Sequence, residues 1–303
     1  MPHPPLRAVI LDNDETTGSY GILFSLLAVL QQIPSINIEY TSIILQKLAQ
    51  WMVTRNVFRP GLKNLLQTCI GLKKQNRIDA IVMYTNQLEQ PLPEELLYKD
   101  NVSHILWSPP RCIAYMMNYL VDDTVFDCML SRPQNADNTK WIMKSFSRVL
   151  DKYPFRPKDI CQMVFIDDMA FPNFIDAKDI PPHLRDVTAW QSVEPYSRRL
   201  TEKEFVDCIT YCFGSSDPAD GFTSAVWDVY QRYIPEKSST ANASPFMILG
   251  ELLQKKFGYV NKHTPPGLNH RTVRLQNGRT LNITIREING GTSEGEHTNS
   301  DTN

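Results

Sequence analysis

The amino-acid sequence predicts an α/β fold in which a doubly wound, mostly parallel sheet forms the middle of three layers. Apolar runs at residues 8–11, 80–84 and 163–166 have the composition of strands that are buried on both faces. Each run is followed at once by a hydroxyl or carboxylate side chain. Because parallel sheets place their ligands beyond the carboxyl ends of the strands, we expect these polar side chains to meet at one edge of the sheet.

The other elements follow from apolar periodicity and from proline and polar residues at helix starts. Pro60 fits the first turn of a helix, where its missing N–H removes no hydrogen bond. Asn138-Thr139 is typical of another helix start. In chain order we expect a strand at 8–12, helices near 20–32 and 40–54, a helix opened by Arg59-Pro60-Gly61, a strand at 79–85, a helix near 112–121, a helix at 139–152, a strand at 162–167 and helices near 201–213 and 219–233.

Changes in composition divide the chain into three parts. Residues 1–236 form the expected α/β domain, with an insertion at about 87–135 that is longer than a strand crossover requires and is interpreted as a small cap. Residues 237–288 form a C-terminal extension with one helix and a β-hairpin. Residues 289–303 are rich in Gly, Ser, Thr and Glu and are predicted to be disordered.

The hairpin is expected at residues 272–285. Asn277-Gly278 is the preferred sequence of a two-residue type I′ turn, and alternating apolar residues flank it. Because a single hairpin is marginally stable in water, we expect it to dock on the main domain or to bind a protein partner.

The composition favours a folded protein without a membrane span. The chain has 303 residues, of which 42% are hydrophobic, enough for one large α/β domain. Its net charge of −2 gives no clear indication of nucleic-acid binding. The apolar stretch at 21–30 is too short to cross a bilayer, and residues 1–5 leave no room for a signal peptide. We therefore expect an intracellular protein, cytoplasmic or nuclear. Its six cysteines, which lack the spacing of a zinc site, are expected to be free thiols.

Two pairs of aspartates are the candidate metal ligands. Asp12 and Asp14 follow the first apolar run, and Asp167 and Asp168 follow the third. Aspartates can simply cap a turn after a strand, but carboxylates crowded at one sheet edge repel one another unless a cation lies between them. Mg²⁺, which prefers oxygen ligands, suits such a place.

These motifs resemble those of the haloacid-dehalogenase superfamily of aspartate-dependent phosphatases. Asp12-Asn13-Asp14-Glu15-Thr16 is similar to the first motif of that family at every fixed position, Thr85 resembles the second, and Asp167-Asp168 resembles the fourth. The third motif is a lysine near the start of the helix before the acidic pair. Lys140 is closer to that pattern, and Lys144, one turn later, is the alternative. The resemblance implies a haloacid-dehalogenase-like fold.

Within the superfamily, the chain looks most like the phosphatases of the RNA polymerase II C-terminal domain. The Asp-Glu-Thr sequence at 14–16 and the Arg59-Pro60 segment resemble theirs. Two features depart from that family: Thr17-Gly18 replaces an apolar pair, and an apolar helix follows where those relatives have a more polar flap.

The resemblance implies a role for each candidate residue. Asp12 attacks phosphorus and forms an aspartyl-phosphate, while Asp14 protonates the leaving oxygen and later takes a proton from water. Thr85 and Lys140, or Lys144 in its place, bind the equatorial phosphoryl oxygens. The implied Mg²⁺ is held by Asp12, by the main-chain carbonyl of Asp14 and by Asp167, with Asp168 orienting a bound water or the lysine.

Three functions stay open at this stage. The first is a protein serine/threonine phosphatase whose substrate is a phosphorylated protein segment. The second is a phosphatase for a small phosphomonoester or a nucleic-acid 3′-phosphate. The third is a protein-binding module that keeps the fold without turnover. An open groove at the insertion favours a peptide, and a closed lid favours a metabolite.

Overall fold

The computed structural model describes most of the chain as two separate units. These units are residues Met1–Tyr259 and Val260–Asn303. The described residues are 6–30, 32, 38–88, 108–132, 144, 146–155, 162–168, 188–214, 221–240, 242–258, 269–274 and 280–285.

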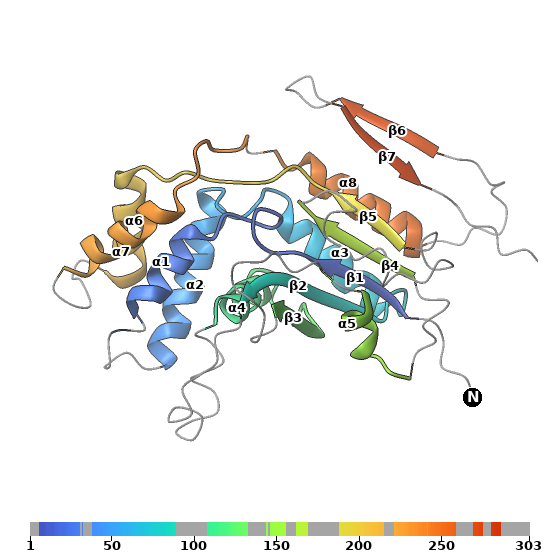
Figure 1. Cartoon of the computed structure of the whole chain (residues 1–303), viewed down its shortest axis with the longest axis horizontal. Helices are drawn as coiled ribbons and strands as arrows, with labels where there is room; N and C mark the ends of the chain where they lie inside the picture. The colour runs from blue at the N-terminus through green and yellow to red at the C-terminus, as the bar shows by residue number, and fades with distance from the viewer. Residues whose placement is uncertain are drawn as a thin grey trace, which may run out of the picture. The chain divides into compact units, whose positions relative to one another are not determined.

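The first unit contains a five-stranded sheet in the order β3-β2-β1-β4-β5 (Figure 1). Every neighbouring pair is parallel. The strands are β1 Arg7–Leu11, β2 Ala80–Leu88, β3 Cys128–Arg132, β4 Gln162–Asp167 and β5 Thr188–Ser192. The predicted α/β class with a parallel sheet is confirmed. Because the chain adds strands on one side of β1 and then crosses to the other, the strand order reverses between β1 and β4, where open α/β sheets form a crevice.

Both faces of the sheet are covered, which is compatible with the predicted three layers. Val9 and Leu11 point into the larger apolar core, and Ala8 and Ile10 point into a smaller one on the opposite face. The smaller core is closed by α5 (Phe146–Asp151). The larger core contains side chains of α1 Gly21–Leu30, α2 Ile38–Thr54, α3 Leu62–Lys74, α4 Pro109–Val121, α6 Glu202–Phe213, α7 Phe222–Tyr230 and α8 Ser244–Leu253.

The described part of the expected cap belongs to the main fold. α4 and β3 both lie within residues 87–135, and β3 is an edge strand of the main sheet. Cys112, Met116 and Met117 of α4 are fully buried in the larger core. Parallel strands need a crossover helix between them, and α4 serves that purpose between β2 and β3. The interpretation of this part as a cap was therefore wrong, and residues 89–107 and 133–135 lie outside the described residues.

Several predicted element boundaries also differ by one to three residues, and two of them concern elements next to the candidate site. β2 continues to Leu88 instead of ending at residue 85, after an irregularity in its pairing with β3. The helix expected at 139–152 is described from Phe146 to Asp151, and residues 139–143 lie outside the described residues.

The first unit extends further than the predicted boundary at residue 236. α8 is followed by a single π-helical turn, η5 (Gln254–Gly258), and lies within this unit. Phe246, Leu249 and Leu253 of α8 are buried in the larger core. Burying these apolar side chains against α3 attaches the helix to the α/β domain rather than to a separate extension.

The second unit contains two antiparallel strands, β6 (Asn269–Arg274) and β7 (Thr280–Ile285). Arg274 pairs with Thr280. A two-residue turn at Asn277-Gly278 would instead pair Arg274 with Leu281, so the observed register does not lead into the predicted turn without an irregularity. The turn residues and the tail predicted to be disordered lie outside the described residues.

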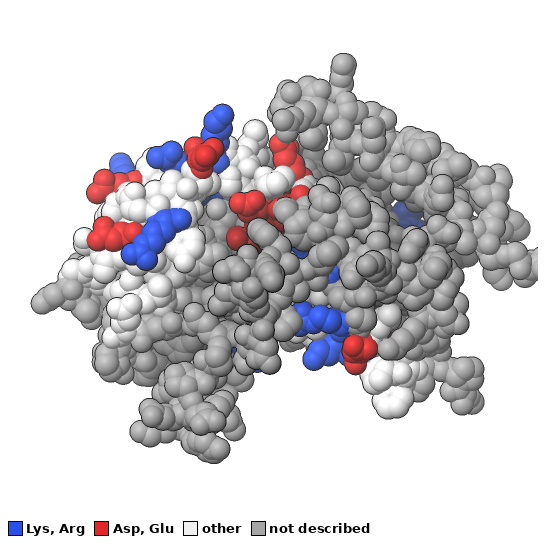
Figure 2. Space-filling view, in the orientation of Figure 1, with Lys and Arg blue, Asp and Glu red and all other residues white. Residues whose placement is uncertain are grey.

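Surface charge and helix length agree with the composition. Acidic and basic side chains are both present on the described part of the face in Figure 2, as the net charge of −2 leads one to expect. Among the helices of the described residues, none has the length and apolar character needed to cross a membrane.

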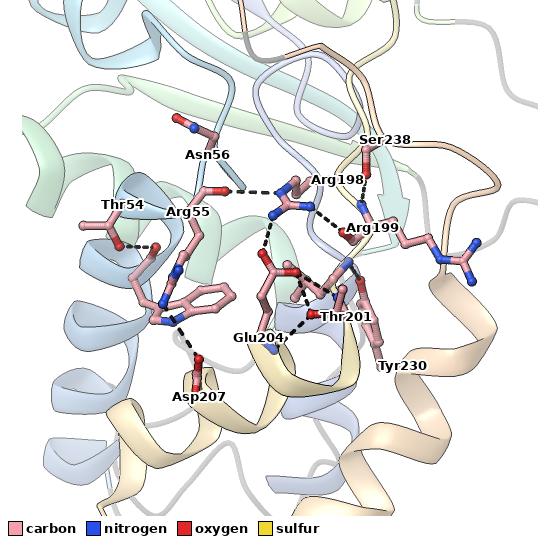
Figure 3. Close-up of polar contacts among 12 residues, drawn as sticks. Thr54, Arg55, Asn56, Arg198, Arg199, Thr201, Glu204, Asp207, Tyr230 and Ser238 are labelled. Carbon is pink, nitrogen blue, oxygen red and sulfur yellow. Dashed lines mark hydrogen bonds and ion pairs between the residues drawn. The ribbon is translucent and has the colours of Figure 1, made fainter.

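A capping box starts α6 and connects it to the loop before it (Figure 3). The Thr201 hydroxyl accepts from Glu204 N at 3.2 Å, and Thr201 N donates to Glu204 Oε2 at 2.9 Å. Arg198 contacts the Glu204 carboxylate and also donates from Nε to Arg55 O at 3.3 Å. The Glu204 carboxylate thus joins the start of α6 to the loop before it, and Arg198 connects that loop to the residue after α2.

Glu204→Gln should make folding stability less sensitive to acid. Burial alone would raise the pKa of Glu204, but hydrogen bonds from Thr201 and the charge of Arg198 outweigh burial and lower it. A carboxyl with a lowered native pKa stabilises the fold above its unfolded pKa, about 4.3, and loses this effect as pH falls toward the native value. Urea unfolding should therefore show a clear deficit for the variant at pH 7 and a smaller one at pH 3. Glu202→Gln, in the same helical turn, is the matched control; an equal deficit at both pH values would contradict the expectation.

Candidate active site

The site lies where the strand order reverses, at the carboxyl ends of β1 and β4. Leu11 pairs with Ile166, and Asp12 N donates to Ile166 O at 3.0 Å. Asp12, the residue after β1, therefore lies next to Asp167, the last residue of β4. Parallel pairing thus brings together two aspartates that are far apart in the chain.

Three carboxylates form one acidic cluster at this edge. Oxygens of Asp12, Asp167 and Asp168 all lie within 4.8 Å of one another. Asp12 is 7% exposed and Asp167 1% exposed, and Asp168 is half-buried. Burial and the charges of Asp167 and Asp168 raise the pKa of Asp12 to about 7, in spite of the opposing charge of Lys144.

Lys144 is the cation of the cluster. Its side chain is buried, and its Nζ contacts Asp12 Oδ1 and lies 2.5 Å from Asp167 Oδ2. Burial alone would lower the pKa of Lys144, but the two aspartates outweigh it and raise it. Lys144 therefore remains an ammonium at neutral pH. Lys144, the alternative in the sequence analysis, contacts both aspartates, and Lys140, which the sequence pattern favoured, lies outside the described residues.

Thr16 connects the first acidic pair to the second. Its Oγ1 lies 3.0 Å from Asp12 Oδ2 and 2.8 Å from Asp168 Oδ1, and it accepts a hydrogen bond from Asp168 N at 2.9 Å. Sequence reasoning missed Thr16 as a site residue, although it is the last fixed position of the first motif. Its place in the first motif is the sequence signal that could have identified Thr16.

Asp14 lies beside the cluster, at the exposed start of a tight turn. Glu15 N donates to Gly18 O at 3.0 Å, and Thr17 N donates to Asn13 O at 2.8 Å. Loss of hydration from surrounding protein atoms, with the charges of Glu15 and Asp168, raises the pKa of Asp14 to about 7. A carboxyl whose pKa is raised in this way keeps its proton at a higher pH than an ordinary aspartate, which favours a general acid.

Glu15, within this turn, has a strained backbone. Its φ of 55° lies in the left-handed region, which costs a residue other than glycine about 1–2 kcal/mol. Such strain persists only where surrounding contacts hold the backbone, and it is common at functional sites.

Thr85 lies at the same edge, on the strand next to β1. It is buried in β2, two residues beyond Met83, which pairs with Leu11. Its hydroxyl accepts a hydrogen bond from Gln87 N at 3.1 Å. The described hydrogen bonds of the acidic cluster join Asp12, Thr16, Lys144, Asp167 and Asp168. Thr85 is placed at the same edge of the sheet by the pairing of β1 with β2.

The donor set fits a divalent cation. The cluster holds three carboxylates and one ammonium, so two negative charges remain uncompensated when all four groups are ionised. The available donors are carboxylate oxygens, which Mg²⁺ prefers, and they stand close enough to share one ion. The carboxylate of Asp14 is not one of these three.

Comparison with known proteins adds no family assignment. No protein-family model matches the chain, and neither a curated protein nor a solved structure matches it. What this site can do therefore rests on its own geometry and on the resemblance in its motifs.

Proposed function

We propose that the protein is a Mg²⁺-dependent phosphomonoesterase that forms an aspartyl-phosphate on Asp12. The observation that carries the proposal is the convergence of Asp12, Lys144 and Asp167 from three separate segments. Burying one lysine with two aspartates is costly, and such an arrangement is common where chemistry requires it. The same residues are those of the phosphatase motifs that the sequence resembles.

Two residues carry the bond changes in this proposal. An Asp12 oxygen forms a bond to phosphorus as the ester P–O bond breaks, and the proton of Asp14 goes to the leaving oxygen. Water then attacks phosphorus and gives a proton to Asp14, and the bond to Asp12 breaks to release inorganic phosphate. The upward direction of the Asp14 pKa shift supports its role as the proton donor.

The other residues bind and neutralise charge. Lys144 places an ammonium beside Asp12, and Thr85 offers a hydroxyl at the same edge. Both groups act on the equatorial oxygens, where transition-state charge collects. Asp12, Asp167 and Asp168 would hold the cation, and Mg²⁺ would supply positive charge that offsets the repulsion between Asp12 and the phosphate.

The proposed substrate is phosphoserine or phosphothreonine in a protein segment. This part rests only on the likeness of the Asp-Glu-Thr and Arg-Pro segments to the phosphatases of the polymerase C-terminal domain. A small phosphomonoester, a nucleic-acid 3′-phosphate and a non-catalytic binding module are the other outcomes that the test distinguishes.

Purified protein should release phosphate from para-nitrophenyl phosphate in the presence of Mg²⁺, and a chelator should stop the release. A panel of phosphopeptides, sugar phosphates and 3′-phosphorylated oligonucleotides then identifies the substrate by the ratio of kcat/KM values. The highest ratio on phosphopeptides would support the proposed class. An inert protein on every member of the panel, with and without Mg²⁺, would support the binding module instead.

A further inference from the structure

The left-handed residue Glu15 is held by contacts from outside its own turn. Its carbonyl oxygen accepts a hydrogen bond from Tyr196 N at 2.6 Å and another from Arg59 Nη2 at 3.0 Å. Tyr196 belongs to the loop after β5, and Arg59 precedes α3. Two segments that are distant in the chain therefore fix the peptide group between Glu15 and Thr16, on the far side of Glu15 from Asp14.

Arg59 is built into the protein interior. It is 4% exposed, and its guanidinium carbon lies 5.3 Å from the ring centre of Tyr196 and 5.2 Å from that of Phe246. Burial lowers the pKa of Arg59 to about 10, so the group stays charged at neutral pH. A planar cation between two aromatic rings has little freedom to move.

The same arginine holds both sides of the Glu15 turn. Its backbone N–H donates to Thr17 O at 2.9 Å, and its guanidinium also donates to Glu194 O. One residue thus contacts the main chain of the turn at two places and the loop after β5 at a third.

The loop that carries Tyr196 is itself anchored to neighbouring helices. The Tyr196 hydroxyl donates to Asn56 O. Two residues later, Arg198 connects the loop to Arg55 and to the start of α6, as Figure 3 shows. The loop that carries Tyr196, on whose ring Arg59 stacks, is therefore connected to the residues that follow α2 and to the start of α6.

We propose that Arg59 is a positioning residue that keeps the Asp14 carboxyl in place for proton transfer by holding the strained carbonyl of Glu15. This inference rests on the proposed phosphatase function. Arg59 acts through the backbone and does not touch the reacting phosphate. Its loss should therefore impair the protonation of the leaving group more than the attack by Asp12.

Substrates with different leaving groups separate these two effects. Nitrophenolate leaves without protonation, whereas the alkoxide of a phosphothreonine peptide needs a proton from Asp14. General acid catalysis contributes about 10²–10⁴-fold. The comparison uses kcat/KM, which covers the steps up to loss of the leaving group and leaves out hydrolysis of the aspartyl-phosphate, in which Asp14 also acts. At saturating Mg²⁺, Arg59→Met should therefore lower kcat/KM on the peptide about 10²-fold and on para-nitrophenyl phosphate less than about 10-fold. Arg55→Met, at an exposed arginine 3.8 Å from Asp207, is the matched control and should change neither rate.

A substitution at Glu15 tests whether the backbone conformation is what Arg59 holds. Glycine adopts the left-handed region freely and alanine does not, although both remove the same side chain. In the Arg59→Met background, Glu15→Gly should recover at least 10-fold of the lost peptide activity, and Glu15→Ala should recover none. If Arg59→Met does not fold, Arg59→Lys, which keeps the charge but not the planar stacking, replaces it in the same series.

The outcomes separate this inference from the proposed function. A wild-type protein that releases no phosphate from either substrate contradicts the phosphatase proposal and this inference with it. An active wild type whose Arg59 variants lose the same factor on both substrates overturns only the role of Arg59. Equal activity of the Glu15→Gly and Glu15→Ala double variants does the same.

Discussion

Asp12→Asn should reduce phosphate release to background, by a factor on the order of 10⁴ or more. Asparagine has nearly the same shape as aspartate but does not form the covalent intermediate, because its amide is a poor nucleophile. The change also removes one of three carboxylates that lie within 4.8 Å of one another. The measurement is kcat on para-nitrophenyl phosphate and on the best phosphopeptide, each with and without Mg²⁺.

The fold should survive this substitution. An amide oxygen at position 12 can still accept from Thr16, and Lys144 keeps its contact with Asp167. Circular dichroism and thermal unfolding should therefore show a folded variant. Asp123→Asn, which breaks a surface ion pair with Lys74, is the control for the chemistry of the change and should keep full activity. Residual activity of Asp12→Asn above about 1% would contradict the role of Asp12 as the nucleophile.

Much of the sheet could be predicted from local sequence, because its central strands are apolar on both faces. β1, β2 and β4 all contain the predicted runs, and parallel pairing brings their carboxyl ends to one edge. The position of Asp12 next to Asp167 follows from that rule and needs no knowledge of distant contacts.

The contact of Lys144 with the aspartates could not be predicted from local sequence. Asn138-Thr139 has the form of a helix start and favours Lys140, and both this start and Lys140 lie outside the described residues. Lys144 lies two residues before α5, and its partner Asp12 is 132 positions away in the chain. Whether a given lysine reaches Asp12 depends on such long-range packing, which local sequence patterns do not contain.

The contacts of Arg59 and of α8 also could not be predicted from local sequence. The sequence predicts that the Arg59-Pro60-Gly61 segment opens a helix with Pro60 in its first turn, whereas α3 begins at Leu62 with Gly61 as its N-cap, so Pro60 precedes the helix. The contacts of Arg59 with Glu15 and Phe246 are made by segments far away in the sequence. The polar linker before α8 predicts that this helix belongs to a separate extension, whereas its buried residues lie in the main core.

Lys144→Met should lower the free energy of unfolding by about 3–5 kcal/mol in the presence of a chelator. Removing the ammonium leaves Asp12 and Asp167 buried together without their cation, and both side chains are at most 9% exposed. Mg²⁺ should recover part of this loss, since an ion present at about 100 times its Kd stabilises the folded state by about 2.7 kcal/mol. Phosphate release should stay low even in Mg²⁺, because the ammonium beside Asp12 is absent.

Two controls define the result. Lys73→Met removes a half-exposed lysine from its ion pair with Asp127, and it should cost about 1 kcal/mol or less, with or without Mg²⁺. Lys140→Met tests the other predicted lysine, and we expect it to lose less activity than Lys144→Met. Urea unfolding with chelator and with Mg²⁺ measures the free energies. If Mg²⁺ stabilises neither the wild type nor Lys144→Met, the three carboxylates are not a metal site, because an ion held by the folded cluster must raise the free energy of unfolding.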